Sequence, residues 1–120
     1  MSNHPVVHIE IPAENSAAAG KFYDEVFGWK TTHDEGMDYT MFEYAESQGG
    51  GFSNLSAENP VGKVVVYLQA EDIDATLAKI EAHGGKTVVP KTEIPTVGWF
   101  AFFNDPTGNT LALYTSMNPS

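Results

Sequence analysis

The sequence predicts an α+β fold built from two βαβββ modules. The first observation is a β-branched run at 6–11, followed by a helix-like stretch that ends at Gly28. A second run, at 63–68, is likewise followed by a helix-like stretch, which ends at Gly84 and Gly85. Three short strand-like segments follow each helix, so the order of elements repeats along the chain. We expect one domain over 1–120, with module one at about 5–57 and module two at about 62–116.

The start of module one predicts a strand and a capped helix. Pro12 ends the strand at 6–11, in which His8 and Glu10 share one face because alternate side chains point the same way. Asn15 or Ser16 can cap the helix, and an alanine run favours it. The apolar stripe of this helix consists of Phe22, Tyr23, Val26 and Phe27.

The rest of module one predicts three strands. Trp29 begins the first, and Gly36-Met37-Asp38 predicts a turn before an aromatic strand at 39–44. The glycines at 49–51 predict a flexible lead into a short strand around Phe52.

Module two predicts the same order. A linker at 58–62 precedes the strand at 63–68, and Ile73, Leu77 and Ile80 recur at helical spacing within 72–83. A strand at 86–89 follows, and strands at 99–103 and 110–114 predict a hairpin around the turn at 104–109.

The composition narrows the class of partner. The 120 residues carry a formal net charge of -10, which repels nucleic acid and anionic membrane surfaces. Hydrophobic residues make up 42% of the chain, enough to form a core. The absence of cysteines excludes disulfides. The chain has no run of membrane-spanning length, so we expect a soluble cytoplasmic protein.

Three features together resemble one family. They are His8 in its strand, the helix end from Phe22-Tyr23 to Gly28-Trp29, and the turn at 105–109. In this order they resemble the glyoxalase/bleomycin-resistance/dioxygenase (vicinal oxygen chelate) superfamily over nearly the whole chain. The resemblance implies that the two modules form a curved mixed sheet around one cup-shaped pocket.

The resemblance also implies where a metal would bind in the metal-using members. His8 falls on the first ligand position, but Val65 and Ala112 fall on the third and fourth, and 47–57 offers no carboxylate for the second. One histidine cannot hold a divalent ion alone, so we expect no cofactor. The alternative is a non-standard site in which Glu10, with Glu43 or His33, joins His8.

The replaced positions predict a binding pocket instead. Tyr67 follows Val65 on the same face of its strand, and Tyr114 likewise follows Ala112 on the same face of its own strand. The two phenols would therefore rim the cavity. Phe52 and Trp99 could add stacking surface, whereas the alternative places strand aromatics in the core or a dimer interface. The predicted ligand-binding residues are His8, Glu10, Phe52, Val65, Tyr67, Trp99, Ala112 and Tyr114.

The leading functional hypothesis is a metal-free binding module for a small aromatic or amphipathic compound, similar to the bleomycin-binding members. The alternative is a lyase or isomerase similar to lactoylglutathione lyase, with an atypical metal or with His8 and Glu10 as acid and base. A third possibility is a structural or regulatory domain. Members of the family often pair, so we also expect a homodimer.

Overall fold

The computed structural model describes residues 4–36, 38–46 and 48–117. The chain divides into two compact units, one over Val7–Val65 and one over Val66–Ser120 together with the residues before Val7. Met37, in the predicted turn, lies outside the described residues. Among the described helices, none has the length and apolar character needed to cross a membrane.

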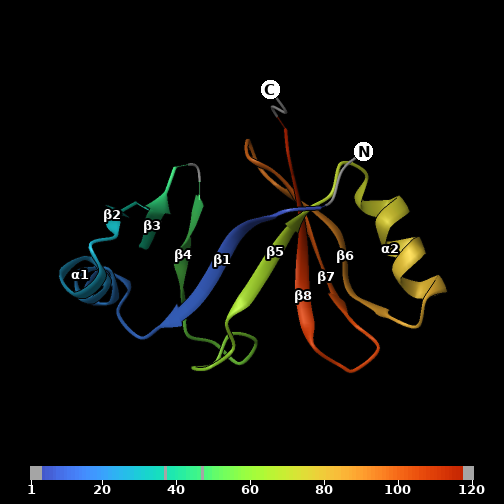
Figure 1. Ribbon diagram of the computed structural model, residues 1–120, viewed down its shortest axis with the longest axis horizontal. Coiled ribbons are helices and arrows are strands. Elements are labelled where there is room, and N and C mark those ends of the chain that lie inside the picture. The colour runs from blue at the N-terminus through green and yellow to red at the C-terminus, as the bar shows by residue number, and fades with distance from the viewer. Residues whose placement is uncertain (1–3, 37, 47, 118–120) are drawn as a thin grey trace. The chain divides into compact units, whose positions relative to one another are not determined.

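Each half of the chain contains one strand, one helix and three further strands, as Figure 1 shows. We call β1–β4 with α1 module one, and β5–β8 with α2 module two. The bounds in module one are β1 Val6–Ala13, α1 Ser16–Phe27, β2 Lys30–Asp34, β3 Tyr39–Ala45 and β4 Gln48–Asn54. In module two they are β5 Val65–Gln69, α2 Ile73–Ala82, β6 Lys86–Ile94, β7 Gly98–Asn104 and β8 Thr110–Ser116.

The strand pairing is equivalent in the two modules. In module one the strand order is β2-β3-β4-β1, with β1 parallel to β4 and the other pairs antiparallel. In module two the order of β5-β8-β7-β6 has the same pattern, with β5 parallel to β8. The predicted α+β class and the repeated βαβββ order are therefore confirmed.

Helix α1 begins and ends as the sequence predicts. The Asn15 side chain accepts a hydrogen bond from the backbone N–H of Ala18 at 3.0 Å, so Asn15, and not Ser16, is the cap. Gly28 ends the helix with a φ of 75°, in the left-handed region that glycine adopts without strain.

The core of module one is a stack of aromatic rings between α1 and the sheet. Phe52 is 0% exposed, and its ring centroid lies 5.5 Å from that of Tyr23 and 5.0 Å from that of Phe42. Trp29 stacks on Phe42 at 4.6 Å and on Tyr23 at 4.9 Å. The aromatic residues of this module thus pack against one another to form its core.

The core of module two is mostly aliphatic. Ile73 and Leu77 from α2 pack on one face of the sheet, where β7 and β8 contribute Ala101, Phe103 and Leu113. Leu113 is 1% exposed and Ile73 is 1% exposed. The helical spacing of Ile73 and Leu77 therefore predicted the buried side of α2 correctly.

The glycines at 49–51 lie within β4, which corrects the expected flexible lead. A Cβ on Gly50 would lie 1.8 Å from the carbonyl oxygen of Ile9, and one on Gly49 would lie 1.9 Å from that of Phe42. Neighbouring backbone approaches too closely for any side chain at these two positions. Glycine here permits tight strand packing.

Strand β6 is longer than the predicted 86–89, because it continues through Pro90 to Ile94. Proline cannot donate a ladder hydrogen bond, but β6 pairs only with β7 in the described sheet order, so an edge strand tolerates it. The register shifts between Val89 and Thr92, at the proline. The sequence therefore predicted the strand but not its continuation past an interruption.

Candidate functional site

Module one has two chemically different sheet faces. Thr40 and Phe42 are buried on the face that α1 covers. Side chains alternate along a strand, so Met41 and Glu43 of β3 point to the opposite face. The register places Lys30 opposite Glu43. We call this uncovered side the open face of module one.

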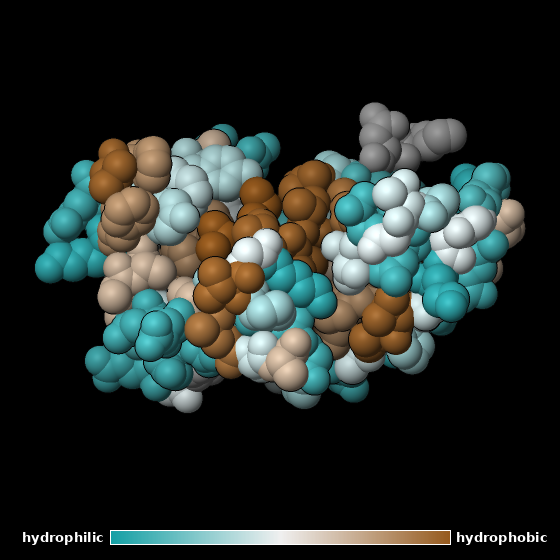
Figure 2. Space-filling view, turned by 90° about the horizontal axis from the view of Figure 1, so that it is seen from below, coloured by the Kyte–Doolittle hydropathy of each residue, from teal (hydrophilic) through white to brown (hydrophobic). Residues whose placement is uncertain are grey.

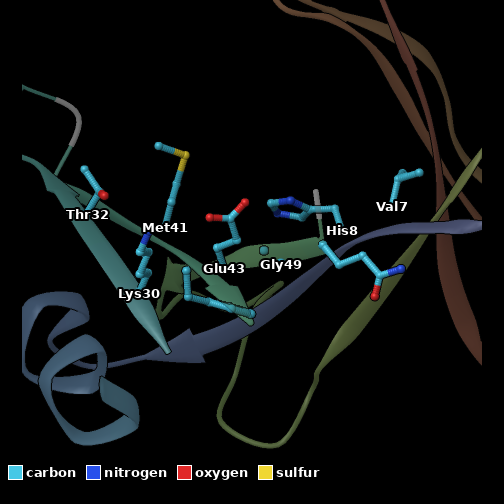
Figure 3. Close-up of a pocket in the computed structure, with 10 residues that line it drawn as sticks. Val7, His8, Lys30, Thr32, Met41, Glu43 and Gly49 are labelled. Atoms are coloured by element: carbon cyan, nitrogen blue, oxygen red, sulfur yellow. The ribbon is translucent and has the colours of Figure 1, made fainter. Parts of the chain in front are cut away.

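A pocket of about 400 Å³ lies on the open face (Figure 3). Figure 3 shows His8, Glu43, Met41 and Lys30 rising from neighbouring strands on the same side of the sheet. Its lining combines two opposite charges, an imidazole and apolar groups. The lining residues are Val7, His8, Lys30, Thr32, Met41, Phe42, Glu43, Gln48, Gly49 and Gly50.

A hydrogen-bonded group of three side chains adjoins the pocket. His8 Nε2 and Glu10 Oε2 lie 2.5 Å apart. The Tyr39 hydroxyl donates to Glu10 Oε2 at 3.0 Å and lies 3.3 Å from His8 Nε2. The His8 side chain is 31% exposed and that of Glu10 is 16% exposed, so the pair is shielded but still reaches solvent. The predicted proximity of His8 and Glu10 is confirmed.

Gly51 makes room for this arrangement. It pairs with Glu10 across the β1–β4 ladder, and a Cβ on it would lie 1.7 Å from the Tyr39 hydroxyl oxygen. Any side chain at position 51 would push the Tyr39 ring away from Glu10. The third glycine of the run therefore makes room for the Tyr39 hydroxyl beside Glu10.

The two extra candidates for a non-standard site lie on different faces. Glu43 lines the pocket with His8. His33 instead contacts Thr40 on the helix-covered face, where its Nδ1 lies 2.6 Å from the Thr40 hydroxyl. His33 thus cannot join His8, since their side chains are on opposite sides of the sheet.

Module two has an aromatic surface on the face that α2 does not cover. The register aligns Tyr67, Ala112 and Phe102 across β5, β8 and β7. The Tyr67 and Phe102 rings meet edge to face at a centroid distance of 6.2 Å, and Ala112 between them is 0% exposed. Phe100 and Tyr114, which pair with each other, lie two residues further along on the same face.

This arrangement tests the sequence prediction for the module-two residues. Tyr67 and Tyr114 lie on the same face of the module-two sheet and are partly exposed. Ala112 has no exposed surface and Val65 is only 4% exposed, so neither side chain offers a ligand much contact area. The two rings meet over Ala112 because its side chain is small.

Phe52 and Trp99 do not lie at either open face. Phe52 is 0% exposed in the aromatic core, and Trp99 packs against the aliphatic core of module two, with the Lys91 ammonium 5.1 Å from its ring centroid. The expectation that they add stacking surface is corrected, because both side chains point toward a helix. Phe52 and Trp99 instead follow the alternative prediction, in which aromatic residues on strands fill the core.

Sequence reasoning missed several lining residues of the pocket. Lys30, Thr32, Met41 and Gln48 carry no motif. Their common signal is strand register, because Lys30 pairs with Glu43 and Thr32 with Met41. A sequence identifies alternating faces but not the pairing of one strand with the next, so this signal needed the structure.

The comparisons with known proteins fit this fold. The pattern of the Glyoxalase/Bleomycin resistance protein/Dioxygenase superfamily matches residues 6–113. The chain belongs to that superfamily.

Individual relatives are similar over most of the chain. A glyoxylase-like domain-containing protein of Didymella fabae is 30% identical over 89% of this chain and 90% of its own length. CFP32 of Mycobacterium bovis, a glyoxylase by name, is 29% identical over 92% of this chain, which spans only 42% of that relative. The crystal structure of the protein BH1468 from Bacillus halodurans has a TM-score of 0.77 at 13% identity and covers 99% of both chains, which shows the fold.

The residues present do not fit the divalent metal that the family resemblance implies. His8 is the one histidine at a matching position, and its Nε2 is hydrogen-bonded to Glu10. Ala112, at another matching position, has no donor and lies beneath two rings. Within residues 4–36, 38–46 and 48–117, no three His, Cys, Asp or Glu side chains form a possible metal-ligand group.

Proposed function

We propose that this protein binds a small organic molecule at the open face of module one without using a metal. The observation that carries this proposal is the pocket of about 400 Å³, in the size range of small-molecule sites. Its walls combine apolar groups from Val7 and Met41 with charged groups from Lys30 and Glu43. Such a lining suits an amphipathic compound.

The chemistry of the superfamily positions supports binding without a metal. Small-molecule recognition needs shape and a few fixed polar groups, which the hydrogen-bonded His8, Glu10 and Tyr39 provide. Metal chemistry would need converging donors, which the described residues do not supply. Aromatic Tyr67 and Phe102 offer a separate partly exposed surface in module two.

Thermal denaturation in the presence of a chelator tests this proposal. A compound library is screened, and a ligand at about 100 times its Kd should stabilise the protein by about 2.7 kcal/mol. For a domain of this size the Tm should then rise by roughly 10 °C. Without any such hit, or with hits that require added metal, the metal-free binding proposal fails.

A matched pair of variants locates the site. Met41 on β3 and Val88 on β6 are 47% and 48% exposed, and both lie on strands. Met41→Trp narrows the pocket and should weaken binding of each hit at least tenfold, whereas Val88→Trp should leave binding unchanged. Equal effects would place the ligand elsewhere.

A second candidate function is proton transfer in a lyase or isomerase reaction. The observation that favours it is the 2.5 Å hydrogen bond between His8 Nε2 and Glu10 Oε2, with the Tyr39 hydroxyl on the same carboxylate oxygen. Such a group could accept a proton from a carbon acid and return it to a neighbouring atom. The similarity to CFP32, a glyoxylase by name, and to a glyoxylase-like domain-containing protein is consistent with this chemistry.

Isotope exchange separates catalysis from binding. A thiohemiacetal of the type that lactoylglutathione lyase converts is incubated in D2O with chelated protein, and NMR follows turnover and deuterium incorporation. An acid-base site predicts turnover that His8→Ala and Glu10→Gln abolish while the folded state persists. Turnover unchanged in both variants rules out this role for the pair.

We further propose that the protein forms a homodimer. Helix α1 exposes three large apolar side chains, Phe22, Val26 and Phe27, at 54%, 57% and 59%. Figure 2 shows tan and brown atoms at the end of the view where Figure 1 labels α1. Light scattering after size exclusion tests the pairing, since a molar mass near 13.0 kDa would exclude a stable dimer.

A further inference from the structure

The pocket of module one contains a positive and a negative side chain that face each other across two strands. Lys30 of β2 pairs in register with Glu43 of β3, and both line the pocket. Opposite charges at directly opposed positions on a sheet commonly attract each other. Among the described residues, however, neither side chain takes part in an ion pair within 4.0 Å.

The other carboxylate nearby is already engaged. Glu10 Oε2 accepts from the Tyr39 hydroxyl and is hydrogen-bonded to His8. Glu43 has no such partner among the described residues, so its carboxylate is the acidic group that a ligand can reach. Figure 3 shows this carboxylate on the same side of the sheet as the His8 ring.

The surroundings of the two charges limit the ligand further. Met41 lies two residues before Glu43 and on the same face of β3. Across the ladder, Met41 pairs with Thr32 of β2. The thioether thus offers an apolar contact beside the charges. The chain as a whole carries a formal charge of -10, which disfavours approach of a purely anionic ligand.

We propose that the preferred ligand is a small zwitterion, with an ammonium group that binds Glu43, a carboxylate that binds Lys30 and an apolar substituent against Met41. This proposal rests on the proposed function, because it names the ligand class of the same pocket. A zwitterion satisfies both side chains at once and brings no net charge to an acidic protein.

Two series of probes that differ only in their charged groups test the ligand class. The first is phenylalanine, 3-phenylpropionate and 2-phenylethylamine, and the second is leucine, 4-methylpentanoate and 3-methylbutylamine. Calorimetry or ligand-observed NMR gives each Kd. In at least one series the zwitterion should bind about tenfold more tightly than the anion and the amine.

Charge variants assign each group to its side chain. Lys30→Met should reduce the affinity for the zwitterion to about that for the amine, and Glu43→Gln should reduce it to about that for the anion. Lys21→Met and Glu25→Gln make the same charge changes on exposed positions of α1 and should leave affinity unchanged. Circular dichroism checks that every variant is folded.

The outcomes separate this proposal from the proposed function. If the amine or the anion binds as well as the zwitterion in both series, or if no probe binds while library compounds do, the zwitterion proposal is wrong and pocket binding stands. The zwitterion proposal also fails if the α1 variants weaken binding as much as the pocket variants. If neither probes nor library compounds bind, both proposals fail.

Discussion

The two modules share one topology but distribute their aromatic residues differently. Module one places its rings between helix and sheet, as Phe42 and Phe52 show, and carries charged groups on its open face. Module two packs α2 with aliphatic side chains and carries Tyr67 and Phe102 on the uncovered face. Strand order and strand alternation therefore set where side chains point, whereas residue type sets what each face can bind.

The last strands of the two modules, β4 and β8, also differ in their glycine content. Gly49, Gly50 and Gly51 occupy consecutive positions of β4, where backbone or the Tyr39 hydroxyl excludes a side chain. The last strand of module two, β8, has no glycine and carries side chains at every position. Gly49 and Gly50 line the pocket of module one without side chains, whereas the β8 side chain of Tyr114 belongs to the aromatic surface of module two.

The largest expected effect on stability comes from replacing a phenylalanine on a helix-covered face, compared with one on an uncovered face. Phe52→Ala removes a ring that is 0% exposed and should lower the free energy of unfolding by about 3–5 kcal/mol. Phe102→Ala removes a partly exposed ring and should cost less, about 1–2 kcal/mol. Urea denaturation measures both. Equal losses would mean that the module-two rings act as core, and the contrast between the modules would disappear.

A smaller effect tests whether Gly51 places Tyr39. Gly51→Ala puts a Cβ where the Tyr39 hydroxyl lies, so the ring must move, at a cost of about 1–3 kcal/mol. Tyr39→Phe removes the hydroxyl group, and with it the hydrogen bonds to Glu10 and His8, and should cost about 1 kcal/mol.

The double variant distinguishes placement from general strain. If Gly51→Ala acts partly by removing the hydrogen bonds of Tyr39, its cost should be smaller in the Tyr39→Phe background. Strictly additive losses in urea denaturation would show that position 51 and the Tyr39 hydroxyl are independent.

The smallest expected effect lies in the turn between β7 and β8 of module two. The Asp105 carboxylate accepts from the backbone N–H and the side-chain amide of Asn109 and from the backbone N–H groups of Gly108 and Thr107, which lowers its pKa below 3.8. A lowered folded-state pKa contributes stability above the ordinary value, and this contribution is lost as the pH falls through the folded pKa. Asp105→Asn should therefore lower the Tm at neutral pH.

Melting curves across acidic pH check the sign. The Tm difference between the native chain and Asp105→Asn should shrink as the pH falls below 3.8. Glu58→Gln, at an exposed loop carboxylate, should show no comparable change. A gap that stays constant with pH would show that the turn depends on shape and not on carboxylate charge.

Local signals were strong enough to predict most of the fold. Asn15 and Gly28 bound α1 because capping and a positive φ depend on residue type. The alternation of His8 and Glu10 in β1 predicted their contact, since side chains two apart on a strand share a face. Pro90 and the glycines at 49–51 were misleading, because a sequence does not show which strand is an edge or how closely backbones approach.

The sequence by itself determined the repeated order of elements and the superfamily. Only the tertiary structure decided which of its polar residues meet, because Lys30 and Glu43 are neighbours through strand register and not through sequence spacing. It also decided that Phe52 is core while Phe102 is surface, although both are strand phenylalanines. The physical reason is that local propensity fixes elements, whereas burial depends on the face that the helix covers.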